Sequence, residues 1–184
     1  MNVSIKLRTA EGRDAAAIAR VHVRTWQAAY RGLLPDSYLR SLDAELDERT
    51  ARWEGFIDAA AARRQTQIVA VDDEQVVGFV TFGPSDEHPH DGRSGEVYAI
   101  YVQPSHWDRG YGRALFTAAQ RGLAAAGFET ATLWVLATNG RARRFYELAG
   151  WTVDGATKTD RRRSVVLHEV RYRSQPLQTG TPAP

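Results

Sequence analysis

Apolar positions along the chain follow two different periods, and these predict the order of its secondary-structure elements. Short apolar runs bounded by polar or turn-forming residues are typical of strands. They cover residues 3–8, 67–71, 76–82, 97–102, 132–137, 151–153 and 163–172. Apolar residues three or four positions apart predict amphipathic helices. These helices cover residues 13–29, 37–42, 47–63 and 113–126, and a further one is expected after Asn139.

The most informative segment runs from residue 96 to residue 151, where a strand, a glycine-containing loop, a helix, a strand and a helix follow one another. Gly127 stands where the first of these helices should end, a position that favours positive φ. The start of such a helix leaves backbone N–H groups exposed, and these attract an anion. We therefore expect the amides of residues 109–114 to point at a diphosphate, which glycine lets the backbone approach closely.

A Gly-x-Gly pair has other interpretations. An ordinary tight turn between strand and helix remains one reading of Gly110 and Gly112. The flanking Arg109 and Arg113, with the strand before and the helix after, favour ligand binding. A nicotinamide cofactor is disfavoured because a third glycine and an acidic residue at the end of the next strand are both absent. A P-loop is excluded because no Gly-Lys-Ser/Thr follows.

Length and composition fit a single domain. The chain has 184 residues, 43% of them hydrophobic and 25% charged, which is ordinary for a globular protein. We expect the domain to span residues 1–173 and the Pro/Gly/Thr-rich residues 174–184 to form a disordered tail. The absence of cysteine excludes disulfides, thiolate zinc sites and a cysteine nucleophile. No apolar run is long enough for a membrane span and no signal peptide is evident, so the cytoplasm is the default location. The net charge of +2 does not indicate a nucleic-acid partner.

The segment from residue 96 to residue 151 resembles the GNAT superfamily of acyl-CoA-dependent N-acetyltransferases. That family usually carries Arg/Gln-x-x-Gly-x-Gly/Ala in its pyrophosphate loop. Here the loop reads WDRGYG, so Trp107 replaces the basic or amide residue and one polar contact is missing. The later stretch NGRARRFYELAGW, which begins at Asn139, fits the family's N-x-x-A-x-x-F-Y-E-x-x-G-F/W pattern without a gap. The resemblance covers roughly residues 3–173.

This resemblance implies an α/β fold: a single domain with a mixed, mostly antiparallel sheet flanked by helices. In that fold the central strand and the strand after Gly127 splay apart to admit pantetheine. The resemblance also implies that acetyl-CoA is the acyl donor and that no metal is needed. Residues expected to bind the donor are Ile100, Val102, Arg109, Gly110, Tyr111, Gly112, Arg113, Ala114 and Asn139. Asn139 can equally serve as the N-cap of the following helix.

Two residues carry the expected chemistry. Glu96 lies fourteen positions before Gly110, where the family often has a general base. A base is needed because an amine arrives as an ammonium with a pKa near ~10 and cannot attack until it loses a proton. Tyr146 is expected to protonate the departing thiolate. The alternatives are a solvated strand end for Glu96 and a packed aromatic beside Phe145 for Tyr146.

The acyl-acceptor site has the weakest signals. Trp26 and Tyr30 lie in a helix and loop similar to those that cover the acceptor cleft in a subset including bacterial polyamine acetyltransferases. Their rings can bind a cationic amine, or simply form the apolar face of the first helix. Acidic residues at 86, 87, 91 and 96 could attract an amine, although such runs are usually solvated. The histidines at 88, 90 and 106 do not have metal-ligand spacing. Residues 161–163 are expected to form a solvated turn, or to contact the 3′-phosphate of the donor.

The predicted function is acetyl transfer from acetyl-CoA to a primary amine of a small molecule, by direct attack through a ternary complex. Main-chain N–H groups near Val102 would hold the oxyanion. Acetylation of a protein N-terminus or lysine is the alternative within the same chemistry. A catalytically silent acyl-CoA sensor is the alternative from another class. The expected partner is the small-molecule amine, and homodimer formation stays open.

Overall fold

The computed structural model describes residues 5–85, 93–162 and 164–177. Its strands form one seven-stranded sheet in the order β1-β2-β3-β4-β5-β7-β6. The strands are β1 (Lys6–Thr9), β2 (Thr66–Asp72), β3 (Gln75–Pro84), β4 (Ser94–Val102), β5 (Thr130–Leu136), β6 (Thr152–Arg162) and β7 (Val165–Arg173). Neighbouring strands are antiparallel except β4 and β5, which are parallel. The mixed, mostly antiparallel sheet expected from the sequence is therefore confirmed.

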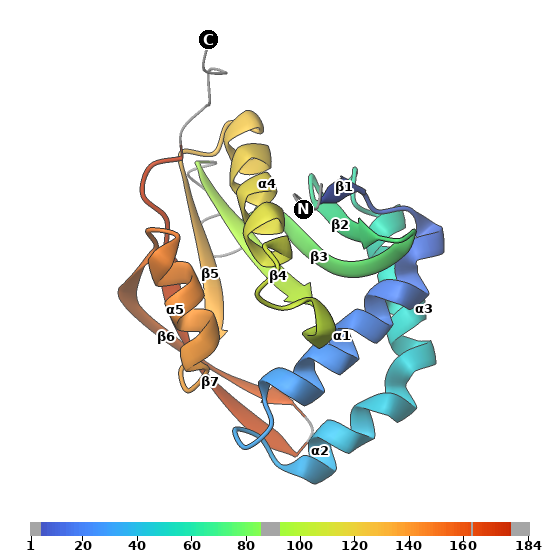
Figure 1. Cartoon of the computed structure of the whole chain (residues 1–184). Helices are drawn as coiled ribbons and strands as arrows, with labels where there is room; N and C mark the ends of the chain where they lie inside the picture. Colours follow the sequence, from blue (N-terminus) through green and yellow to red (C-terminus); the bar gives the residue numbers. More distant parts are fainter. Residues whose placement is uncertain (1–4, 86–92, 163, 178–184) are drawn as a thin grey trace.

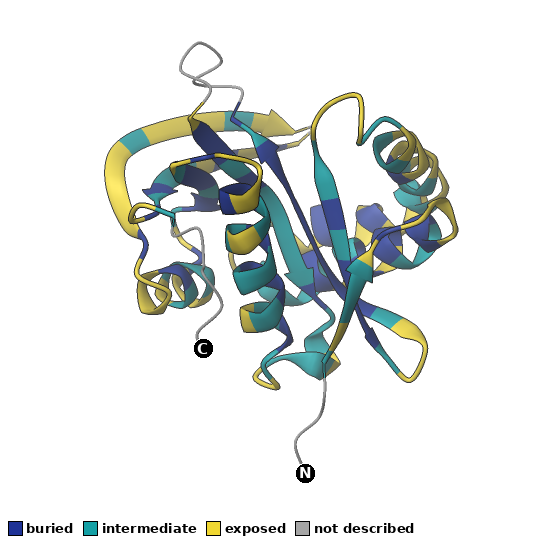
Figure 2. Ribbon diagram, turned by 90° about the horizontal axis from the view of Figure 1, so that it is seen from above, coloured by how far each residue is buried: buried dark blue, intermediate teal, exposed yellow. Residues whose placement is uncertain are grey.

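Helices cover both faces of this sheet (Figures 1 and 2). The helices are α1 (Ala15–Ala29), α2 (Asp36–Ser41), α3 (Leu46–Asp58), α4 (Tyr111–Ala125) and α5 (Gly140–Leu148). Short 3₁₀ turns cover Gly12–Asp14, Leu42–Glu45 and Pro104–His106. Buried side chains of α4 and α5 pack on one face of the sheet, and those of α1 and α3 pack on the other. A third cluster joins α1 and α2 to the end of the β6–β7 hairpin.

Close packing of α4 explains one glycine of its sequence. A Cβ at Gly122 would lie 2.5 Å from the Phe82 ring of β3. Leu115, Ala119 and Leu123, which recur at helical spacing, are completely buried beneath the same helix. The helix therefore lies directly on β3 and β4, and this fixes the position of the loop from which it begins.

The central strands separate after a short pairing. Only Ser94, Gly95 and Glu96 of β4 pair with β5, opposite residues 130–132. Beyond that point β4 continues against β3, while β5 continues against β7. The two strands diverge visibly in Figure 1, with α4 and α5 in front of them. The predicted splayed strand pair is thus present, and its vertex is at Glu96.

Several boundaries differ from the sequence-based predictions, and three differences bear on the argument. β6 runs for 11 residues to Arg162, where residues 161–163 were expected to form a turn. The helix predicted for residues 47–63 ends at Asp58 and continues as turns. The predicted disorder of residues 174–184 is wrong for residues 174–177, because the Ser174 and Leu177 amides donate to main-chain carbonyls at 2.8 and 2.7 Å. The rest of that tail lies outside the described residues.

Candidate active site

The loop before α4 has the shape of an anion cradle. Gly110 has φ +89° and is the N-cap of α4, and Asp108 also has a positive φ, +60°. The first amides of a helix have no intrahelical acceptor, so those of Tyr111, Gly112 and Arg113 remain available. A Cβ at Gly112 would lie 3.7 Å from Phe145, an ordinary contact, so packing alone does not demand glycine there. Such a helix start can bind an anionic group.

One of the amides predicted to bind the diphosphate, that of Ala114, already has an acceptor within the protein. The Ala114 amide donates to the Gly110 carbonyl at 2.9 Å and so closes the first turn of α4. It therefore cannot turn toward a phosphate in the way expected from the sequence. The helix start offers three amides, and the loop adds those of Arg109 and Gly110.

Trp107, which departs from the family pattern, fastens this loop to the end of β4. Its Nε1 donates to the Val102 carbonyl at 2.7 Å. The guanidinium of Arg141, from the first turn of α5, lies 3.9 Å from the centre of the Trp107 ring. Arg141 also pairs with Asp108, at 3.1 Å. A guanidinium therefore lies beside the loop at the point where the usual basic or amide residue is missing.

The free edge of β4 offers further main-chain groups. The Gln103 amide donates to the Val77 carbonyl of β3 at 2.7 Å. Antiparallel pairs alternate, so Ile100 and Val102 direct their N–H and C=O groups away from β3. The Val102 carbonyl is already taken by Trp107. The Ile100 groups and the Val102 amide are left to face the gap between β4 and β5.

Asn139 has a capping role. Its Oδ1 accepts a hydrogen bond from the Ala142 amide at 3.1 Å, which caps α5. The side chain is buried, with an exposed fraction of 7%. The amide end of the side chain has no role in the cap, so contact with the pantetheine arm remains a hypothesis.

Glu96 lies at the vertex of the splayed strands, opposite Thr132 of β5. The buried Ser85 hydroxyl donates to its Oε2 at 3.4 Å. Val97 packs into the core beneath α4, and successive strand residues alternate between faces. The half-buried Glu96 carboxylate therefore belongs to the opposite face, the side on which α1 lies.

Tyr146 is buried on the second turn of α5, with its ring 5.4 Å from Phe116. Burial, with a smaller contribution from the Tyr101 phenol, raises the pKa of Tyr146. The pKa of Tyr30 is also raised, by burial and then by the phenols of Tyr101 and Tyr146. Three hydroxyls from α1, β4 and α5 thus lie close enough to influence one another. Tyr101 was not identified from the sequence, because in an apolar strand it reads as a core residue.

The aromatic side chains of α1 form the other wall of this space. Trp26 and Tyr30 meet edge to face at 4.8 Å between ring centres. His22 stacks on Tyr101 at 4.7 Å. Within the described part of the chain neither imidazole nitrogen has a hydrogen-bond partner. Burial, then the charges of Arg49, Arg162 and Arg52, lower the pKa of His22 to about 3.

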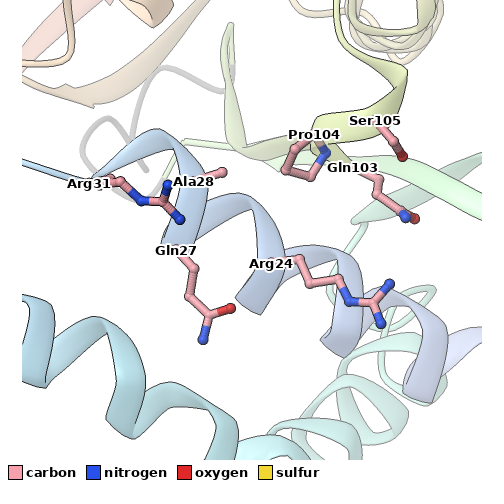
Figure 3. A pocket seen from close by; sticks show the side chains of 7 residues that line it. All are labelled: Arg24, Gln27, Ala28, Arg31, Gln103, Pro104 and Ser105. Atoms are coloured by element: carbon pink, nitrogen blue, oxygen red, sulfur yellow. The ribbon is translucent and has the colours of Figure 1, made fainter.

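A cleft of about 290 Å³ opens between α1 and the segment that follows β4 (Figure 3). Its lining residues are Arg24, Gln27, Ala28, Arg31, Gln103, Pro104 and Ser105. The Gln27 amide is engaged by the Leu39 carbonyl and by Asp43, at 3.2 and 3.0 Å. Arg24 of α1 and Arg31, which follows the end of that helix, make the cleft electropositive.

Comparison with known proteins identifies the family. The profile of the "Acetyltransferase (GNAT) family" matches residues 24–151. The chain belongs to the GNAT family. It is 32% identical over 137 residues to the N-acetyltransferase YuaI of Bacillus subtilis (strain 168), uncharacterized by its own description, covering 73% of each chain.

Solved GNAT structures share the fold. The PaiA N-acetyltransferase of Thermoplasma acidophilum, in complex with coenzyme A, superposes with a TM-score of 0.75 at 17% identity, covering 94% of this chain and 99% of that one. YncA of Salmonella typhimurium, with its cofactor acetyl-CoA, gives a TM-score of 0.68 at 23% identity and covers 98% of both chains. As a GNAT member the chain is an acyl-CoA-dependent N-acetyltransferase, and acetyl-CoA is its acyl donor.

Two other properties concern only the described residues. No group of histidine, aspartate or glutamate side chains there could hold a metal ion. No described helix is long and apolar enough to cross a membrane. His106 contacts Asp72 at 3.2 Å, while the histidines at 88 and 90 and the acidic run at 86, 87 and 91 lie outside the described residues.

Proposed function

We propose that this enzyme transfers the acetyl group of acetyl-CoA to a primary amine of a small molecule, by direct attack within a ternary complex. The observation that carries the proposal is the divergence of β4 and β5 immediately after Glu96, with Tyr146 in the adjoining wall. A carboxylate, free main-chain amides and a phenol thus surround one gap. Direct transfer also agrees with the absence of cysteine, since no thiol is available to form an acyl-enzyme.

Glu96 acts as the base in this scheme, either directly or through water. The acceptor ammonium gives its proton to the carboxylate, and the free amine then attacks the thioester carbonyl carbon. The position of Glu96 on the α1 face supports entry of the amine from that side. Opposite entry of the two substrates brings amine and thioester together in the gap between β4 and β5.

The tetrahedral intermediate needs donors for its oxyanion. The Val102 amide, which faces the gap, supplies one in a fixed position. Collapse of the intermediate breaks the carbon–sulfur bond, and the Tyr146 hydroxyl donates a hydrogen bond to the departing thiolate. The second proton of the attacking nitrogen then passes to this sulfur, so the products are the amide and the thiol of coenzyme A. Because the pKa of Tyr146 is raised, the phenol stays protonated and stabilises the thiolate chiefly by hydrogen bonding. Complete proton transfer would be uphill, since an ordinary thiol pKa is about 8.5.

The loop before α4 (residues 107–110, the cofactor loop) and the first turn of that helix bind the diphosphate of the donor through the amides of residues 109–113. Arg141 supplies the positive charge that Trp107 cannot. The main-chain N–H and C=O groups of Ile100 form hydrogen bonds with the amide groups of the pantetheine arm, as they would with a neighbouring strand. Asn139 contributes from the start of α5.

A coupled activity and binding assay tests the proposal. The protein is incubated with acetyl-CoA and a panel of amines, and thiol release is followed against a control without amine. Turnover with small primary amines is expected. Turnover confined to peptides would instead favour a protein N-terminal or lysine acetyltransferase. Acetyl-CoA binding without turnover of any amine or peptide would favour the non-catalytic sensor.

A further inference from the structure

Arg162, at the end of β6, reaches the aromatic wall built by α1. Its guanidinium carbon lies 5.3 Å from the centre of the Trp26 ring. The positive charge also acts on the phenols of Tyr30 and Tyr101. A residue from near the end of the chain therefore places a permanent cation at the acceptor side of the gap. The face of Trp26 that could hold a cationic amine is already occupied by this guanidinium.

The Arg162 guanidinium is hydrogen-bonded within the protein through Nε, while its Nη atoms remain available to a ligand. Its Nε donates to Asp160 Oδ2 at 2.6 Å, and no other hydrogen bond of Arg162 occurs within residues 5–85, 93–162 and 164–177. Glu169, the other nearby carboxylate, pairs with Lys158 at 3.5 Å. The Nη atoms of Arg162 thus keep donors in the planar arrangement that suits a carboxylate. About half of the side chain is exposed, so a small ligand can reach it.

Resting on the proposed function, we infer that the acceptor is an amine that also carries a carboxylate, and that Arg162 binds this carboxylate. The amino group of such a molecule lies toward the thioester in the gap between β4 and β5, while its carboxylate lies against the guanidinium beside Trp26. A polyamine is disfavoured by the same charge, since Arg162 repels a second cation. The inference therefore favours an amino-acid-like acceptor over a polyamine.

The carboxylate is a spectator in the chemistry. The amine nitrogen forms the new bond to the acetyl carbon, the carbon–sulfur bond breaks, and the amine proton leaves through Glu96. Arg162 keeps its proton throughout. Its contribution is consequently to binding and orientation, and it should appear as a preference among acceptors rather than as a change in the pH dependence of the reaction.

Matched acceptors test this inference. Free amino acids, their carboxamides and their decarboxylated amines are compared as acceptors, with putrescine as a polyamine. The wild type is compared with Arg162→Met, Arg162→Lys and the control Arg161→Met, whose side chain leaves β6 on the opposite face. Each kcat/KM for a carboxylate is divided by that for its carboxamide in the same variant. Comparing this ratio between variants cancels the difference in amine basicity between the two acceptors and isolates the coupling to residue 162.

We expect the wild type to prefer carboxylates. Arg162→Met should lower the ratio by ~10- to 100-fold, the range for losing hydrogen bonds to a charged group. The ratio for Arg162→Lys should lie between those of the wild type and Arg162→Met, and the ratio for Arg161→Met should equal that of the wild type. Acetyl-CoA affinity, measured by calorimetry, should be the same in all four proteins.

Two results would overturn the inference and leave the proposed function standing. One is a wild-type preference for carboxamides, decarboxylated amines or putrescine. The other is an unchanged ratio in Arg162→Met. If no amine of the panel is acetylated although acetyl-CoA binds, both the inference and the proposed small-molecule activity fail. Should Arg162→Met fold poorly by circular dichroism, the ratio measured for Arg162→Lys replaces that of Arg162→Met in the second comparison.

Discussion

The guanidinium of Arg141 stacks on the Trp107 ring at 3.9 Å and is held there by the Asp108 carboxylate, at 3.1 and 3.2 Å. These contacts join the start of α5 to the loop that precedes α4. Trp107 is in turn bonded to the end of β4 through Val102. Trp107 therefore has no polar side-chain group for the donor, but its ring holds the guanidinium of Arg141, from another helix, beside the loop.

Removal of this arginine should weaken donor binding. We expect Arg141→Ala to reduce acetyl-CoA affinity by about tenfold, the effect of losing one hydrogen bond to a charged group. Titration calorimetry measures the change, with Arg40→Ala on α2 as the control. Trp107→Phe keeps the ring but loses the indole N–H, so a smaller loss is expected. Equal affinities in wild type and Arg141→Ala would show that Arg141 only braces the loop.

Negative charge in the cofactor loop or the first turn of α4 should prevent donor binding. Gly110→Asp and Gly112→Asp each put a carboxylate where a diphosphate is expected. Gly110→Asn is the matched control, because it has nearly the same shape, tolerates positive φ and carries no charge. We expect the aspartate variants to show no measurable acetyl-CoA binding and Gly110→Asn to retain part of it. Equal affinity of the Asp and Asn variants would contradict the diphosphate assignment.

The local parts of this site could be predicted from the sequence, because each depends on neighbours in the chain. A glycine loop before a helix and an asparagine before the next helix have signals within a few residues. No nearby residue in the sequence indicated the role of Arg162. Its contact with Trp26 arises only because β6 and β7 fold back beneath α1. The length of β6 was missed for a related reason. Most of its residues are exposed on an edge strand, so the apolar alternation that marks a strand is absent.

Glu96→Gln should slow catalysis without changing the fold. The amide keeps the shape of the carboxylate but cannot accept the amine proton, so kcat/KM should fall by ~10²–10⁴ at neutral pH. Part of the rate should return at high pH, where more amine is already unprotonated. Rates are measured from pH 6 to 9 with the best acceptor of the panel. Wild-type rates across this range would move the base elsewhere, such as to a water held by main-chain carbonyls.

Tyr146→Phe should affect the chemical step alone. The expected result is a lower kcat with little change in acetyl-CoA affinity, because the lost hydrogen bond belongs mainly to thiolate departure. The raised pKa of Tyr146 adds a second expectation. No loss of activity from phenol ionisation should occur up to pH 9. A basic limb near pH 8 that disappears in Tyr146→Phe would contradict the assignment.

His22 should make the fold sensitive to acid. Its pKa is lowered from 6.5 to about 3 by burial and by nearby arginines. Between these values the unfolded chain binds a proton that the native imidazole does not, so the free energy of unfolding falls as pH falls. The stabilisation is complete above pH 6.5 and is lost at about 1.4 kcal/mol per pH unit below it. From pH 6.5 to pH 4.5 the loss should be on the order of 2–3 kcal/mol.

A non-titrating variant isolates this contribution from that of the acidic residues. His22→Phe keeps an aromatic ring stacked on Tyr101 and removes the proton-binding nitrogens. Urea denaturation at pH 7, 5.5 and 4.5 gives the free energy of unfolding of each protein. Arg8 lowers the pKa of Asp14, and the Ala156 amide followed by Arg171 lowers that of Asp154, in both cases against the effect of burial. These two carboxylates destabilise both proteins equally in acid. The free energy of unfolding should therefore fall less in His22→Phe than in the wild type as the pH falls. Parallel pH profiles would mean that the imidazole is protonated in the folded state, paired with a group or water inside the aromatic cluster.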